Sequence, residues 1–61
     1  MEIVLRESAV VQGHVEIVEV DGDPSKVPSK RTFDSEEAAI SAIAQYLGVL
    51  ASELDQVTYQ L

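Results

Sequence analysis

The first twenty residues combine apolar and polar side chains in a pattern typical of β-strands. The stretch EIVLRESAVVQGHVEIVEV, residues 2–20, is rich in β-branched residues and contains one glycine, Gly13. Such a stretch predicts a hairpin, two strands joined by a two-residue turn that includes Gly13. If Gln12 and Gly13 form the turn, Arg6 lies opposite Glu19 as an oppositely charged cross-strand pair.

The two faces of this predicted hairpin differ, because successive side chains of a strand point to opposite sides. The bulkier apolar face, which we expect to form the core, holds Ile3, Leu5, Ala9, Val11, Val18 and Val20. The other face is polar at its open end and apolar near the turn, where Val10, Val15 and Ile17 gather. We take these three as interaction-face candidates, since nothing covers them unless a bulge rotates them or another molecule meets them.

The segment TFDSEEAAISAIAQYLGV, residues 32–49, has the spacing of an amphipathic helix. Asp34 is a suitable N-cap, Glu37 stands at the capping-box position three residues later, and Gly48 fits the left-handed residue that ends a helix near Leu47. The predicted buried stripe consists of Ala39, Ile40, Ile43, Ala44 and Leu47.

The remaining segments complete a β-β-α-β order. DGDPSKVPSK, residues 21–30, is a loop by its prolines and lack of period, VLASELDQ is a short helical turn anchored by Leu54, and VTYQL alternates as a third strand. The expected fold is a single α+β domain over residues 1–61. It has a three-stranded antiparallel sheet in the order 2-1-3 and one helix on one face.

Charge changes this picture in one respect. The chain has 11 acidic and 4 basic residues in 61, a net charge of −7, which argues against nucleic-acid binding and against an anionic membrane surface. Three of the four basic residues, Lys26, Lys30 and Arg31, lie in the predicted loop or directly after it. They are basic-loop candidates for contact with a phosphate or an acidic partner.

Candidate chemistry is sparse. The chain has no cysteine, and its one histidine, His14, is predicted at an exposed turn, which offers no supported nucleophile-base pair. The carboxylates of residues 19–23 resemble the start of a calcium loop, but Lys26 and Thr32 stand where that loop needs glycine and glutamate. We therefore expect no enzyme activity, no cofactor and no metal.

The stretch from Thr32 to Leu61, a capped Ala/Ile helix ending in LGV and followed by a V-x-Y-x-L strand, is similar in outline to the small N-terminal domain of Jag-type RNA-binding proteins. The likeness covers half of the chain, and the N-terminal hairpin departs from it. No function or site residue follows from it.

These observations favour a small non-enzymatic protein-protein interaction module that self-associates through the helix-free sheet face. A homodimer or another protein is the expected partner. The alternative is an acidic inhibitor or nucleic-acid mimic that binds a basic groove of a host nucleic-acid enzyme. The N-terminus shows no basic and apolar leader, and no run of about 18 apolar residues occurs, so we expect a cytoplasmic location without membrane attachment.

Overall fold

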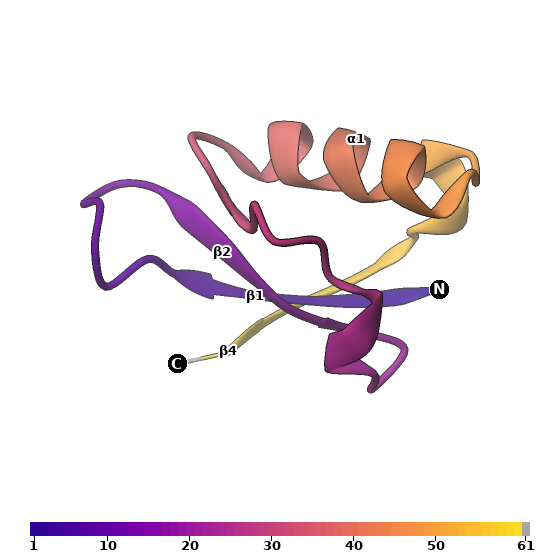
Figure 1. Ribbon diagram of the computed structural model, residues 1–61, viewed down its shortest axis with the longest axis horizontal. Coiled ribbons are helices and arrows are strands. Elements are labelled where there is room, and N and C mark those ends of the chain that lie inside the picture. Colours follow the sequence, from indigo (N-terminus) through magenta and orange to yellow (C-terminus); the bar gives the residue numbers. More distant parts are fainter. Residues whose placement is uncertain (61) are drawn as a thin grey trace.

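A computed structural model describes residues 1–60 and shows one helix lying across one face of a sheet (Figure 1). Within these residues the elements are β1 (Glu2–Glu7), β2 (Val15–Val20), the 3-10 turn η1 (Pro24–Lys26), β3 (Thr32–Phe33), α1 (Glu36–Leu47), the 3-10 turn η2 (Ala51–Glu53) and β4 (Gln56–Gln60). The α+β class and the single helix are confirmed. None of the described helices is long and apolar enough to cross a bilayer.

The predicted three-stranded antiparallel sheet is wrong in strand number and in the direction of the last strand. The sheet has four strands in the order β3-β2-β1-β4, and β4 runs parallel to β1. The physical reason is β3, whose two residues were expected to lie just before the cap of the helix. Because β3 pairs antiparallel with β2, it reverses the chain once more before α1, and the helix then returns the chain in the direction of β1.

The hairpin also departs from the prediction, because a seven-residue connection, residues 8–14, joins its strands. Arg6 therefore pairs with Glu16 instead of Glu19, and its guanidinium lies 2.7 Å from the Glu16 carboxylate. The register shifts between Val4 and Leu5, whose partners are Glu19 and Ile17.

The shift leaves Val18 without a partner, which makes it the extra residue of a β-bulge. Beyond a bulge the alternation of side chains changes phase, so Ile17 and Val20 both point into the core although one is odd and the other even in number. Of the predicted core face, Ile3, Leu5 and Val20 are buried. Val18 is only half-buried, and Ala9 and Val11 are exposed in the connection.

The start and end of helix α1 are determined by residues that directly flank it. Ser35, not Asp34, is the N-cap, because its hydroxyl accepts a hydrogen bond from the Ala38 amide at 3.1 Å. Gly48 ends the helix in the left-handed conformation with φ of 71°, as predicted. The predicted stripe is confirmed: Ala39, Ile43 and Ala44 are buried, and Ile40 and Leu47 pack against the core.

Two residues outside the regular elements complete the core. Val27 follows η1 and is 6% exposed, and Leu54 follows η2 and is 3% exposed. Each short helical turn thus anchors a connection by one apolar side chain. Leu54 is the anchor predicted from sequence, whereas residues 21–30 were expected to form only a loop.

Candidate protein interaction surface

The open edge of the sheet is β4. This strand pairs only with β1, so its other side carries unpaired backbone donors and acceptors. Its sequence, Gln-Val-Thr-Tyr-Gln, contains no charged residue and no proline, although a quarter of the chain is charged. Charges, prolines and bulges are the devices that normally keep an edge strand from pairing with another chain. The described length of β4 has none of these devices.

The side chains of β4 divide between the two faces of the sheet. Val57 and Tyr59 pair with the core residues Ile3 and Leu5 and share their face, on which α1 lies. Val57 packs against the core, whereas Tyr59 stays 49% exposed. Gln56, Thr58 and Gln60 point to the helix-free face and are exposed.

Tyr59 is oriented by the first turn of the helix. Its hydroxyl donates a hydrogen bond to the Glu36 carboxylate at 2.7 Å. This hydrogen bond, followed by desolvation and the negative charge of Glu36, raises the pKa of the Tyr59 hydroxyl above its ordinary value. On the other face, the Thr58 hydroxyl donates to the Glu2 carboxylate at 3.3 Å. Side chains on both faces are therefore positioned while the strand edge stays free.

At the opposite edge, the two-residue β3 is the outermost strand and covers only part of β2. β3 pairs with the first residues of β2, and the Ile17 amide donates to the Arg31 carbonyl at 2.8 Å. Farther along, Val20 and Asp23 form an isolated bridge just before η1. The outer side of β2 is thus paired along most of its length, which leaves β4 as the longer free edge in residues 1–60.

The three interaction-face candidates do not lie together on the helix-free face, so their predicted placement is wrong. Ile17 is fully buried in the core, and Val15 packs against the core on the helix side. Val10 is 91% exposed, but it lies in the connection, where its amide donates to the Ser8 hydroxyl. The bulge and the longer connection cause these changes, since both alter which side chains share a face.

The helix-free face itself is mostly polar. Val4, which is 8% exposed, is the buried apolar side chain of this face, and it lies between Glu19 of β2 and Thr58 of β4. None of the large apolar side chains that are exposed in residues 1–60 belongs to this face. The free edge is therefore a better candidate surface than the face.

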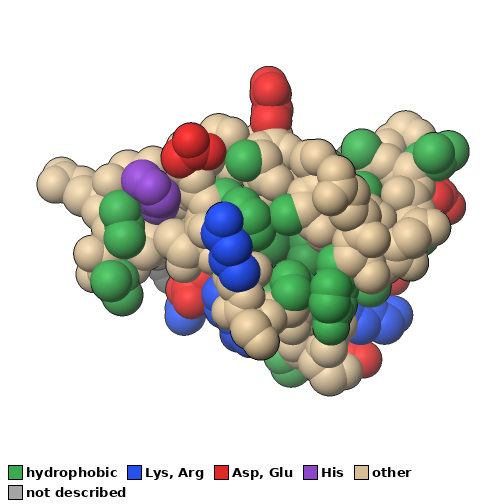
Figure 2. Space-filling view, turned by 45° about the horizontal axis from the view of Figure 1, so that its top comes forward, with side chains coloured by type: hydrophobic (Ala, Val, Ile, Leu, Met, Phe, Trp, Pro, Cys, Tyr) green, Lys and Arg blue, Asp and Glu red, His purple; other side chains and the backbone are tan. Residues whose placement is uncertain are grey.

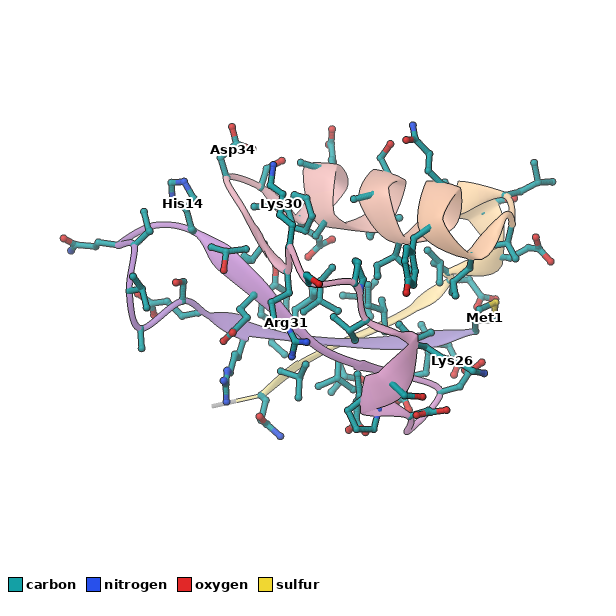
Figure 3. The ribbon with its side chains drawn as sticks, viewed as in Figure 1. Met1, His14, Lys26, Lys30, Arg31 and Asp34 are labelled. Carbon is teal, nitrogen blue, oxygen red and sulfur yellow. The ribbon has the colours of Figure 1, made fainter. Side chains whose placement is uncertain are left out.

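The basic-loop candidates point in different directions. Figure 3 shows Lys30 beside the start of α1, Arg31 toward the sheet and Lys26 at η1, so their charges do not converge on one ligand. The Lys30 ammonium lies 5.3 Å from the centre of the Phe33 ring, a cation-π contact. Their predicted role with a phosphate or acidic partner stays a prediction.

The surface of residues 1–60 is hollowed beside the hairpin connection and beside α1. One hollow of about 630 Å³ lies between the hairpin connection and the end of β4 and includes His14 and Tyr59, and another of about 440 Å³ lies beside Tyr46 and Lys30. Figure 2, in which the helix side of the molecule comes forward, shows apolar side chains on this surface and His14 toward one end of it. His14 Nδ1 is buried without a hydrogen-bond partner in the described part of the chain. Residues 1–60 contain no group of three side chains placed to hold a metal ion.

The last strand was predicted beside the first, but none of its residues was predicted to form a site. The signal was present, since Gln56–Gln60 is an uncharged strand in an acidic chain. Family models, curated proteins and solved structures were compared with the chain, and nothing matches in any of the three comparisons.

Proposed function

We propose that this chain is a non-enzymatic protein-protein interaction module that self-associates through the free edge of β4. The observation that carries the proposal is the uncharged, unblocked strand Gln56–Gln60 at the end of the sheet. Strand addition at such an edge uses backbone hydrogen bonds for affinity and alternate side chains for specificity. This differs from the expectation of association through the helix-free face, which has no exposed apolar group.

The edge strand also lets two acidic copies approach without bringing charged residues of the strand face to face. Each copy carries a net charge of −7, so two copies repel at long range. Salt screens that repulsion, with a Debye length of about 10 Å at 0.1 M and about 3 Å at 1 M. Self-association through the neutral β4 is therefore expected to become tighter as salt is added.

The experiment is sedimentation equilibrium of the full chain over a wide concentration range, with one test variant and one matched control. Thr58→Lys places a charge in the free edge, and Thr32→Lys makes the same change in β3 at the opposite edge. We expect a concentration-dependent dimer for the unchanged chain and for Thr32→Lys, and a monomer for Thr58→Lys. Circular dichroism checks that both variants stay folded.

Two results would contradict the proposal. A monomer at every concentration and salt level would remove self-association, and equal dimerisation of the two lysine variants would remove β4 as the surface.

The acidic-inhibitor alternative predicts the opposite salt effect, because attraction to a basic partner weakens as salt rises. In its favour, Glu2, Glu16 and Glu19 share the helix-free face, and the one basic side chain among them, Arg6, is already paired with Glu16.

A further inference from the structure

The sequence of β4 is symmetric in residue type about its centre. Thr58 is the middle residue, the apolar Val57 and Tyr59 flank it, and Gln56 and Gln60 stand at the ends. Read in either direction, the strand is Gln, apolar, Thr, apolar, Gln. In a two-fold antiparallel pair, residue i of one copy faces residue j of the other and j faces i, so a strand of this kind can place residues of the same type opposite each other.

Geometry restricts the registers that two copies can use. In an antiparallel pair, directly opposite side chains point to the same face. A two-fold axis between two β4 strands must therefore pass through a residue position, since a register centred between two residues would oppose side chains of different faces. A register centred on Val57 or Tyr59 pairs only three of the five β4 residues with β4 residues of the other copy. A register centred on Thr58 pairs all five.

We propose that the partner is a second copy of this chain, whose β4 pairs antiparallel with the first across a two-fold axis at Thr58. This inference rests on the proposed function and adds the partner, the strand direction and the register. The two sheets then join into one continuous sheet of eight strands, and both copies of α1 lie on the same face.

The cross-strand pairs of this register are favourable on both faces. On the helix side, Val57 meets Tyr59 of the second copy twice, and pairs of an aromatic with a β-branched residue stabilise sheets by roughly 0.2–1 kcal/mol each. On the other side, Thr58 meets Thr58, and Gln56 meets Gln60. No charged residue of β4 faces another, so the pairing has no like-charge contact along the strand.

The helix leaves this edge accessible. α1 packs against β2, β3 and η2, and reaches β4 through the hydrogen bond of Glu36 with Tyr59.

The area buried by a five-residue strand pair is small beside the roughly 1,200–2,000 Å² of a standard stable interface. The dimer is therefore expected to be weak and to dissociate on dilution.

Single-cysteine cross-linking tests the register, because the chain has no cysteine of its own. The variants are Thr58→Cys, Gln56→Cys and Gln60→Cys, three exposed positions on the helix-free face. Directly opposite residues of an antiparallel pair have Cα atoms about 4.5–5.5 Å apart, within the range that a disulfide spans. Residues four positions out of register lie about 13 Å apart along the strand, at about 3.3 Å per residue, and cannot be bridged.

We expect a disulfide-linked dimer for Thr58→Cys alone under mild oxidation. Gln56→Cys alone and Gln60→Cys alone are expected to give none, while an equal mixture of the two is expected to give the mixed dimer. Cross-linking of Gln56→Cys with itself would indicate parallel strands or an antiparallel register centred on Gln56, and either would overturn the inference. A dimer in sedimentation that shows none of these cross-links would also overturn it and would leave the interaction module standing. A monomer in sedimentation would remove the module and the register together.

Discussion

The most discriminating prediction about the fold concerns Ile17, because its position depends on the bulge at Val18. Ile17 is fully buried in the structure, whereas a hairpin with a two-residue turn places it on the opposite face. Ile17→Ala removes three carbon atoms. At about 0.8 kcal/mol for each buried CH₂ group, the lost transfer free energy alone is about 2.4 kcal/mol. The cavity that remains adds to this, and measured costs for such changes span about 2–5 kcal/mol.

That cost is large for a chain of 61 residues. At roughly 0.05–0.15 kcal/mol per residue, the whole free energy of unfolding is about 3–9 kcal/mol. The assay is urea unfolding followed by circular dichroism at a protein concentration low enough to keep the chain monomeric. With a denaturant slope of about 1 kcal/mol per M, the midpoint of Ile17→Ala is expected to fall by about 2 M or more.

Two companion variants make the result interpretable. Val10→Ala changes a side chain that is 91% exposed, so its free energy of unfolding is expected to change by no more than about 0.5 kcal/mol. Ile17→Val covers the case in which Ile17→Ala does not fold, and about 1 kcal/mol of destabilisation is expected for it. If Ile17→Ala and Ile17→Val both matched Val10→Ala, the bulge and the buried position of Ile17 would be refuted.

Two further predictions concern the start of α1. Ser35→Ala is expected to reduce the free energy of unfolding by about 1 kcal/mol and Asp34→Ala by less than about 0.5, as measured by urea unfolding, because Ser35 makes the capping bond; the reverse order would assign the cap to Asp34. In a Tyr46→Phe background, ultraviolet titration of Tyr59 is expected to give a pKa above the ordinary value near 10, and Glu36→Gln is expected to lower it. Because the pKa is raised by folding, the stabilisation by this hydrogen bond is complete below pH about 10 and is lost as pH rises through the folded pKa; equal alkaline loss of stability in Tyr59→Phe would contradict this.

Local features of the chain were predictable because their causes lie within a few residues. The helix period from Ala39 to Leu47 and the left-handed end at Gly48 follow from spacing and from the conformational freedom of glycine. The cap was misplaced by one residue, since Asp34 and Ser35 are both good capping residues and only the path of the preceding strand decides between them.

The candidate surface was only partly predictable. The position of the last strand beside the first was expected, and the lack of charge in Gln56–Gln60 can be read directly from the sequence. Whether this strand forms the longer free edge depends on the order of the strands, however, and β3 lies at the other side of the sheet, next to β2. Val10, Val15 and Ile17 were chosen because strict alternation was assumed through a hairpin that contains a bulge.

The sequence by itself determined the helix, the presence of strands at both ends of the chain and most residues of the core, because hydrophobic period and end signals act locally. Only the tertiary structure decided the strand directions, the seven-residue connection and the face on which Ile17 lies. A strand completes its hydrogen bonds with residues far away in the chain, and a shift of one residue exchanges its two faces. Those choices are made by the packing of the whole domain, in which α1, Val27 and Leu54 favour the register that buries Ile17.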